Sequence, residues 1–144
     1  MKSLIIFDSQ FGNTQKIAKA IADGLGTKAV SVADVEMADL SDLDLVVVGS
    51  PINGWRPSVK MLEFLAKLKS DSLKGVKAAA FDTRIKLFIH GDAASKIAKS
   101  LEKAGATIIS TPKPFYVKGT EGPLFENEIK NAQKWTESIK SQFE

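Results

Sequence analysis

One short polar segment has the residue types that bind a phosphate group. Residues 9–14 read Ser-Gln-Phe-Gly-Asn-Thr and separate an apolar run from a segment of helical period. Such a loop offers hydroxyls, an amide, a glycine that lets the backbone approach a ligand, and the free N–H groups of a helix start. A helix cap formed by Asn13 or Thr14 is the competing structural interpretation. The candidate phosphate-binding residues are Ser9, Gln10, Phe11, Gly12, Asn13 and Thr14.

Two later segments also combine unusual residues. Residues 50–57 read Ser-Pro-Ile-Asn-Gly-Trp-Arg-Pro, so a tryptophan with a large π-face lies in a loop stiffened by proline on both sides. Residues 82–91 read Asp-Thr-Arg-Ile-Lys-Leu-Phe-Ile-His-Gly, and their stretch 85–89 is unusually apolar for an exposed loop. That stretch is interpreted as an extra strand, a partner-docking lip or a lid. Trp55 has the alternative role of covering the core edge, and His90 that of an ordinary loop histidine near a helix start.

The elements that must position these segments follow an alternating pattern. Apolar runs predict strands over residues 3–8, 29–32, 44–49, 76–81 and 107–110, the last resuming over 115–117 after a break at 111–114. Segments of helical period predict helices over residues 14–25, 58–68, 92–104 and 125–143. Such alternation is typical of a doubly wound parallel sheet, which binds ligands beyond the carboxyl ends of its strands. The expected site therefore lies after residues 8, 49, 81 and 110.

Composition excludes several kinds of site. The 144 residues contain no cysteine and one histidine, so disulfides, a thiolate nucleophile, an iron–sulfur cluster and a multi-histidine metal site are excluded. No apolar run approaches the ~20 residues of a membrane span. The first apolar run is also too short for a signal peptide. We therefore expect a single domain over residues 1–144, located in the cytoplasm.

Basic residues are unevenly distributed along the chain. The net charge is +3, and residues 56–86 carry 8 basic and 3 acidic side chains, whereas residues 1–55 carry 4 basic and 7 acidic ones. The chain has neither interleaved aromatic residues nor a nucleic-acid motif, so most of these lysines are expected on the solvent faces of helices. A nucleic-acid partner is not expected.

At these residues the chain resembles the flavodoxin family, whose phosphate loop reads Thr/Ser-x-Thr-Gly-x-Thr. Ser9, Gly12 and Thr14 match this pattern, and Asn13 is a common occupant of its place. Phe11 stands where a hydroxyl residue is usual, so the resemblance implies that backbone alone replaces one side-chain phosphate contact. The resemblance continues at residues 47–51, 79–84 and 115–124. The last two segments are similar to a short-chain, stand-alone group from bacteria and archaea.

The resemblance implies both a fold and a function. The expected fold is a flavodoxin-like three-layer α/β sandwich with a five-stranded parallel sheet of order 2-1-3-4-5 and helices on both faces. The expected function is electron transfer between redox partners through a non-covalent FMN, and a carrier is favoured over an enzyme that turns over a substrate. A monomer or weak dimer is expected.

The resemblance also assigns residues to the flavin ring. Its implied contacts on one face are Ser50, Pro51, Ile52, Asn53, Gly54, Trp55 and Arg56. Gly54 is the candidate for a peptide flip that offers a carbonyl to the reduced ring, because glycine adopts either sign of φ. The implied contacts at the other face are Asp82, Thr83, Arg84 and Gly91, and Phe88 or His90 is a candidate for packing on the ring.

The basic segment departs from the acidic character of typical flavodoxins. Arg56, Arg84 and Lys86 are expected near the ring, where a cation would stabilise a reduced anion by about 1 kcal/mol. We therefore expect a less negative potential for the second electron than in an acidic flavodoxin. The same charge predicts a redox partner with an acidic docking face.

Two other functions remain compatible with the residues. The first is an FMN-dependent oxidoreductase acting on a quinone or porphyrinogen-like molecule, which needs a pocket over the ring that only residues 85–90 could build. The second is a flavin-free binding module, because fold does not fix function. A phosphoacceptor receiver domain is excluded, since the strand over residues 44–49 ends in Gly49 and not in aspartate.

Overall fold

The structure is a computed structural model and describes residues 1–87 and 91–144. Its strands are β1 (Ser3–Phe7), β2 (Ala29–Ser31), β3 (Leu45–Asn53), β4 (Arg56–Pro57), β5 (Lys77–Ile85), β6 (Thr107–Ile108) and β7 (Lys113–Val117). Its helices are α1 (Asn13–Leu25), α2 (Val59–Ala66), α3 (Ala94–Lys103) and α4 (Glu128–Lys140), with short 3-10 turns η1 (Met37–Leu40) and η2 (Ser141–Phe143). No helix in these two ranges is long and apolar enough to cross a membrane.

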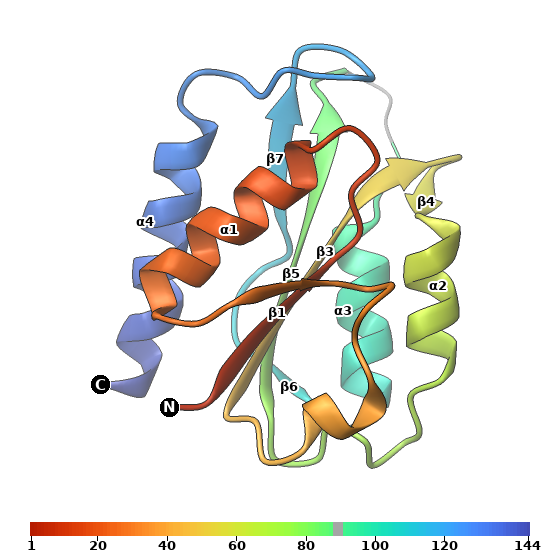
Figure 1. The fold of residues 1–144 in the computed structure, drawn as a ribbon, viewed down its shortest axis with the longest axis vertical. Helices are drawn as coiled ribbons and strands as arrows, with labels where there is room; N and C mark the ends of the chain where they lie inside the picture. The colour runs from red at the N-terminus through yellow and green to blue at the C-terminus, as the bar shows by residue number, and fades with distance from the viewer. Residues whose placement is uncertain (88–90) are drawn as a thin grey trace.

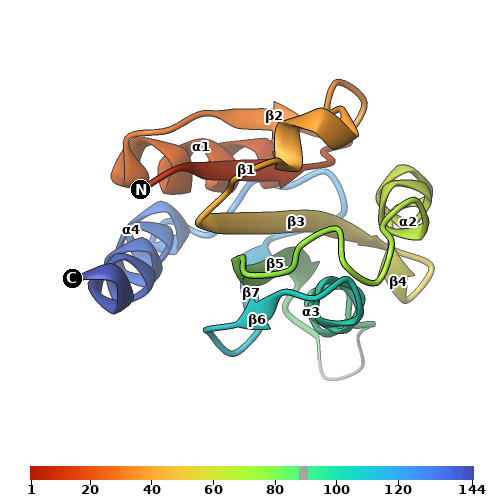
Figure 2. The ribbon, with the colours of Figure 1, turned by 90° about the horizontal axis from the view of Figure 1, so that it is seen from below.

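The sheet has the order β2-β1-β3-β5-β6, and these strands pair in parallel. β7 follows β6 along the same side of β5 and also pairs in parallel with β5. β4 is a two-residue strand that pairs antiparallel with β3. The expected order 2-1-3-4-5 is therefore observed once this hairpin strand is left out of the count. Figure 2 shows α1 and α4 on one face of the sheet and α2 and α3 on the other.

The central strands are buried on both faces, which explains their near-continuous apolar residues. Ile5 packs with α1 and α4, while its neighbour Ile6 packs on the opposite face with α2 and α3. Successive side chains of a strand point to opposite faces, so each central strand contributes to both cores.

An aromatic cluster fixes the spacing of the sheet beneath the site. The rings of Phe81, Phe115 and Trp135 meet edge to face, with centroids 5.9–6.2 Å apart. A Cβ added at Gly49 would lie 2.1 Å from the Phe81 ring, so only glycine fits beside this ring on β3. This close packing holds the carboxyl ends of β3 and β5 at one level.

The structure corrects the sequence prediction at three strand ends. β5 runs to Ile85, so residues 82–84 belong to a strand and not to a loop. β7 begins at Lys113 and includes Pro114, which an edge strand tolerates because its outer side needs no N–H donor. Residues 50–57, expected as a loop, continue β3 and return through a tight turn into β4.

Candidate functional site

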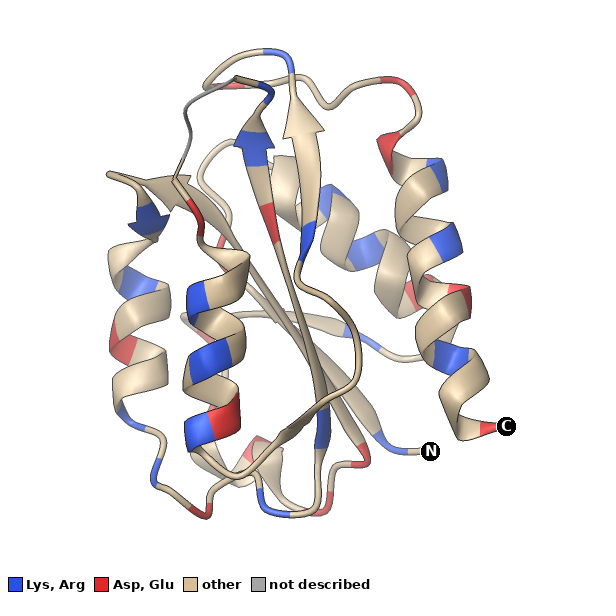
Figure 3. Ribbon diagram, turned by 180° about the vertical axis from the view of Figure 1, so that it is seen from behind, with Lys and Arg blue, Asp and Glu red and all other residues tan. Residues whose placement is uncertain are grey.

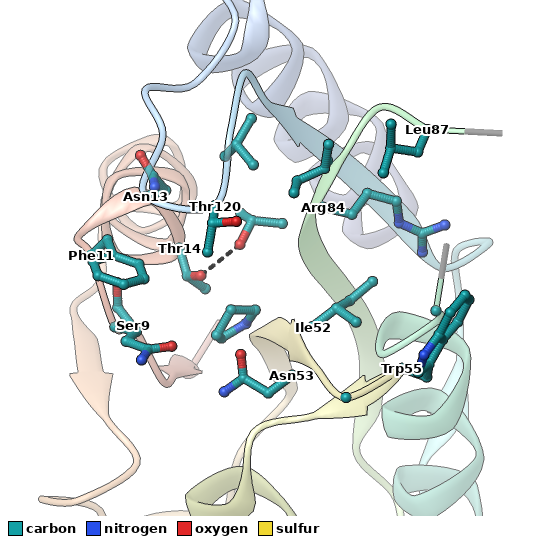
Figure 4. Close-up of a pocket in the computed structure, with 17 residues that line it drawn as sticks. Ser9, Phe11, Asn13, Thr14, Ile52, Asn53, Trp55, Arg84, Leu87 and Thr120 are labelled. Carbon is teal, nitrogen blue, oxygen red and sulfur yellow. Dashed lines mark hydrogen bonds between the residues drawn. The ribbon is translucent and has the colours of Figure 1, made fainter. Parts of the chain in front are cut away.

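Four strand ends converge on one cavity. The carboxyl ends of β1, β3, β5 and β7 point to the same edge of the sheet, at the top of Figure 1. The cavity there has a volume of about 270 Å³. We call residues 8–15 its loop end, and the hairpin 52–57 with segments 82–87 and 91–92 its hairpin end (Figure 4). Its lining residues are Ser9, Gln10, Phe11, Asn13, Thr14, Pro51, Ile52, Asn53, Gly54, Trp55, Thr83, Arg84, Ile85, Leu87, Gly91, Val117 and Thr120.

The loop end is organised around the Ser9 hydroxyl. Ser9 Oγ accepts hydrogen bonds from the backbone N–H groups of Gly12 (3.1 Å) and Gln15 (3.3 Å). Gly12 occupies the N-cap position of α1 with φ 92° and has no side chain to cap the helix, so the Ser9 hydroxyl accepts from the first turn instead. The interpretation of Asn13 or Thr14 as the cap is therefore wrong, because glycine in a left-handed conformation makes the turn instead.

Asn13 and Thr14 connect the loop end to distant parts of the chain. Asn13 Nδ2 donates to the carbonyl oxygen of Glu121 at 3.1 Å. The hydroxyls of Thr14 and Thr83 lie 2.8 Å apart in a buried hydrogen bond, the dashed line in Figure 4. These contacts fix the start of α1 against β5 and against the segment after β7.

The backbone of the loop end still presents donors to the cavity. In the described ranges, the backbone N–H groups without a hydrogen-bond partner here are those of Gln10, Phe11, Asn13 and Thr14. A helix start with free N–H groups attracts an anion through both its donors and its dipole. The loop end can therefore hold a small anionic group.

The hairpin end presents an exposed aromatic side chain. Gly54 (φ 58°) and Trp55 (φ 72°) are both left-handed, as in the tight turns that suit the twist of a hairpin. The Trp55 side chain lines the cavity, is 58% exposed and belongs to neither core. The alternative that Trp55 covers the core edge is therefore wrong.

The turn is held against the segment that precedes α3. The Trp55 carbonyl oxygen accepts from the Asp92 N–H at 3.3 Å and from Lys96 Nζ at 3.4 Å. A Cβ added at Gly91 would lie 2.3 Å from Trp55 Cα, so the two backbones touch because position 91 is glycine. Gly91 thus lets the hairpin and the start of α3 close one side of the cavity.

A buried ion cluster supports this end. The fully buried Asp82 carboxylate accepts from Arg84 Nε (2.8 Å) and Nη2 (2.6 Å). It also accepts from the backbone N–H groups of Ala93 (3.2 Å) and Ala94 (2.9 Å). Burial alone would lower the pKa of Arg84, but the hydrogen bond and charge of Asp82, with the charge of Asp92, raise it above its ordinary value. Arg84 stays cationic, and Asp82 offsets its charge.

Four sequence-predicted residues do not line the cavity: Gly12, Ser50, Arg56 and Asp82. Gly12 shapes the turn before α1, and the Ser50 hydroxyl joins the two arms of the hairpin by donating to Pro51 and accepting from the N–H of Ser58. Asp82 holds the ion cluster, and Arg56 is exposed on β4. The other predicted residues line the cavity: Ser9, Gln10, Phe11, Asn13, Thr14, Pro51, Ile52, Asn53, Gly54, Trp55, Thr83, Arg84 and Gly91.

Among the described lining residues, four were not assigned to the site from the sequence. Ile85 and Leu87 lie in the stretch interpreted as an extra strand, a docking lip or a lid, and the other two are Val117 and Thr120. Val117 and Thr120 were missed because the last strand was expected to reach the site edge at residue 110, whereas β7 carries it to Val117. The strand-like run 115–117 was the available signal. The predicted roles of Phe88 and His90 concern residues outside the described ranges.

Of the cations expected near the ring, Arg56, Arg84 and Lys86, two do not line the cavity. Lys86 Nζ lies over the rings of Tyr116 (5.6 Å) and Phe125 (5.9 Å), and Lys86 does not line the cavity. Arg84 is the single lysine or arginine among the lining residues described. Of the three cations expected near the ring, Arg84 alone lines the cavity among the described residues, and Asp82 offsets its charge. Within residues 1–87 and 91–144, no group of three or more His, Asp or Glu residues is arranged to hold a metal ion.

Comparison with known proteins gives consistent matches. A family model described as flavodoxin domain matches residues 4–114. A flavodoxin from Maridesulfovibrio salexigens is 32% identical over 120 residues, which cover 75% of this chain and 81% of that protein. Two solved flavodoxins have a similar fold. One, from an archaeon, is 22% identical with a TM-score of 0.81 over 99% of this chain and 98% of its own. The other, oxidised flavodoxin 1 of Bacillus cereus, is 18% identical with a TM-score of 0.81 and covers 98% of both chains.

Proposed function

The chain belongs to the flavodoxin domain family, and we propose that it binds FMN non-covalently in the cavity and carries electrons between redox partners. The observation that carries the proposal is the division of the cavity into an anion-attracting loop end and an apolar, partly exposed hairpin end. This division matches a ligand with a phosphate at one end and a planar ring at the other.

The loop end fits a phosphate group. Backbone N–H groups at the start of α1, including those of Asn13 and Thr14, have no partner in the described ranges. The Ser9 hydroxyl accepts two hydrogen bonds and keeps its own proton for donation. These groups would hold the phosphate, and the dipole of α1 would favour its charge.

The hairpin end fits a planar ring. Ile52, Trp55 and Leu87 give it apolar walls, and Trp55 and Leu87 reach solvent at the rim (Figure 4). Apolar walls exclude water from a bound ring while an open rim leaves one edge accessible. When bound, the flavin supplies one- and two-electron transfer. The protein's residues would orient the flavin. Gly54 at the turn can adopt either sign of φ, so the peptide at this position can flip toward the bound ring.

We further propose that the redox partner docks with an acidic face. Exposed basic residues lie on β4, α2 and α3, the elements next to the exposed Trp55 and Val59, and Figure 3 shows Lys and Arg as blue bands that outnumber the red acidic bands along both helices. These residues are Arg56, Lys60, Lys96 and Lys99. Complementary charge steers association and sets partner choice. Charge reversal of Lys60 and Lys99 should slow electron exchange with an anionic oxidant such as ferricyanide and leave exchange with a neutral one-electron oxidant unchanged.

The test of FMN binding is a titration followed by absorption near ~450 nm and by quenching of flavin fluorescence. Wild-type protein should retain flavin through gel filtration, and Trp55→Ala should weaken binding because it removes an aromatic wall. Val59→Ala is the matched control, since Val59 is 64% exposed on the same side and does not line the cavity. A protein that leaves the FMN spectrum unchanged would refute the proposal.

Stepwise reduction separates a carrier from an oxidoreductase. Two resolved one-electron steps and no turnover of added quinone would support the carrier. A single two-electron step with rapid quinone reduction would support the enzyme instead.

A further inference from the structure

A short loop after β7 reaches the loop end of the cavity. Residues 118–123 leave β7 and turn back, and an antiparallel bridge between the two flanking residues closes the base of this loop. Within it, the Lys118 N–H donates to the carbonyl oxygen of Pro123 at 2.8 Å, and the Gly122 N–H donates to that of Gly119 at 2.9 Å. These hydrogen bonds hold the backbone in one shape, and we call it the 118–123 loop.

The tip of the 118–123 loop packs against the start of α1. Thr120 and Glu121 are the central residues of its turn. Asn13 Nδ2 donates to the Glu121 carbonyl oxygen at 3.1 Å. A Cβ added at Gly122 would lie 2.6 Å from Asn13 Oδ1, so the loop and the helix approach closely because position 122 is glycine. The tip is therefore held beside the free N–H groups of the loop end.

The Thr120 side chain brings a hydroxyl to the cavity. It is exposed and lines the cavity together with Asn13 and Thr14 (Figure 4). In the part of the chain that the structure describes, the Thr120 hydroxyl has no hydrogen-bond partner. The Thr14 hydroxyl, by contrast, is buried and paired with Thr83. Thr120 thus offers a donor that comes from outside residues 9–14.

The groups around Thr120 suit an anion better than a neutral group. The backbone at the start of α1 presents N–H groups, the Ser9 hydroxyl keeps its proton for donation, and the exposed Gln10 amide can turn its NH₂ to the same place. The Glu121 carbonyl oxygen, an acceptor on the same loop, is already paired with Asn13. Donors from two separate segments match the acceptor oxygens of a phosphate.

We propose that the 118–123 loop is a second wall of the phosphate site, and that the Thr120 hydroxyl donates a hydrogen bond to the phosphate of the bound flavin. Asn13 and Gly122 are positioning residues, because their contact places the loop against α1. This inference rests on the proposed function. Hydrogen bonds to charged groups are the stronger ones, so this contact should contribute about tenfold to the affinity for FMN.

The decisive comparison is between Thr120→Val and Thr120→Ser. Valine keeps the shape of threonine and removes the hydroxyl, whereas serine keeps the hydroxyl. Thr120→Val should bind FMN about tenfold less tightly than the wild type, and Thr120→Ser should bind it nearly as tightly. Riboflavin, which lacks the phosphate, should bind equally to all of them. Thr111→Val is the matched control, since Thr111 is exposed and does not line the cavity.

Gly122→Ala tests the positioning of the loop. The added Cβ must push the tip away from Asn13, so FMN binding should weaken in the wild-type background. The same substitution should cost no further FMN affinity in Thr120→Val, because the contact that it displaces is already absent. Inorganic phosphate, titrated as a competitor of FMN, should lose affinity in the same variants, and riboflavin should not.

Each outcome of these titrations decides between the possibilities. Equal FMN affinity in the wild type and Thr120→Val would overturn the inference, and so would an equal loss for FMN and riboflavin. Additive losses in the double variant with Gly122→Ala would refute the positioning role. In each of these cases the wild-type protein still binds FMN, so the proposed function stands. Failure of the wild-type protein to bind FMN would overturn the proposed function and the inference together.

Discussion

The two ends of the cavity are stabilised by different interactions. At the loop end, the turn itself is formed by hydrogen bonds between residues that are close in sequence, as when the Ser9 hydroxyl accepts from Gly12 and Gln15. At the hairpin end, a buried charge joins two successive elements, as when Asp82 accepts from Arg84 on the same strand and from the start of α3. The loop end is a single strand-to-helix connection, so its own residues form the turn. The hairpin end is built from three separate segments, 52–57, 82–87 and 91–92, which need hydrogen bonds between them to stay together.

This difference predicts where each end is sensitive. A local turn with several weak hydrogen bonds loses a little stability for each bond removed. A buried ion cluster fails as a unit, because deletion of one partner leaves an uncompensated charge away from water. The following substitutions test this contrast.

The largest expected effect is that of Asp82→Asn. The substitution leaves the buried Arg84 without its main counter-charge and weakens the hydrogen bonds to Ala93 and Ala94, so the free energy of unfolding should fall by about 3–5 kcal/mol. Ser9→Ala is the loop-end counterpart and should cost only about 1 kcal/mol. Urea unfolding of both variants measures the difference. Equal losses would contradict the contrast between the two ends.

The second comparison uses one glycine from each end. A Cβ at Gly91 would meet the Trp55 backbone at 2.3 Å, so Gly91→Ala must displace the hairpin and should cost about 3 kcal/mol. Gly12 has open space around its Cβ position but φ 92°, so Gly12→Ala should cost only the strain of a left-handed backbone, about 1–2 kcal/mol. Backbone amide NMR shifts provide a second readout. Gly91→Ala should move the Trp55 resonance, and Gly12→Ala should not.

The same contrast explains what the sequence could predict. The loop end follows from consecutive residues, so its strand, its turn and the helix after it could be predicted to within a residue or two. The extension of β5 could not be predicted, because charged residues such as Asp82 and Arg84 usually indicate a loop. A buried strand tolerates them here because they pair with each other, and that pairing forms only in the folded protein.

Pro114 misled the prediction for a related reason. Proline argues against a strand unless that strand is at the edge of the sheet, and edge position is a property of the whole fold. The expected break at 111–114 placed the edge of the site after residue 110, which hid Val117 and Thr120 from the predicted site. The aromatic cluster of Phe81, Phe115 and Trp135 likewise joins elements that no local pattern connects.

The hydrogen bond between Thr14 and Thr83 connects the two ends and allows a sharper test. Thr83→Val leaves the Thr14 hydroxyl buried without its partner, so the free energy of unfolding should fall by about 1–2 kcal/mol. The double variant with Thr14→Val should lose less than the sum of the single losses, because no unpaired hydroxyl remains. A double-mutant cycle in urea measures this coupling. Strictly additive losses would show that the ends are independent.

The smallest effect is expected for Glu126→Gln, which tests whether charge or burial makes the hairpin end sensitive. Lys118 and Glu126 form an ion pair like that of Arg84 and Asp82, but both side chains are exposed to solvent. The hydrogen bond and charge of Lys118 lower the pKa of Glu126 below its ordinary value of 4.5. A carboxylate with a depressed pKa stabilises the fold above its unfolded pKa and loses that contribution as the pH falls through the folded one.

Glu126→Gln should therefore lower the melting temperature only slightly at neutral pH, and not at all well below pH 4.5 or in high salt, because solvent and ions screen an exposed pair. Asp82→Asn should remain strongly destabilising in the same salt, since its partner is buried. Thermal unfolding of both variants at low and high salt makes the comparison. A loss in Glu126→Gln as large and as salt-resistant as that in Asp82→Asn would show that pairing, and not burial, determines the sensitivity of the hairpin end.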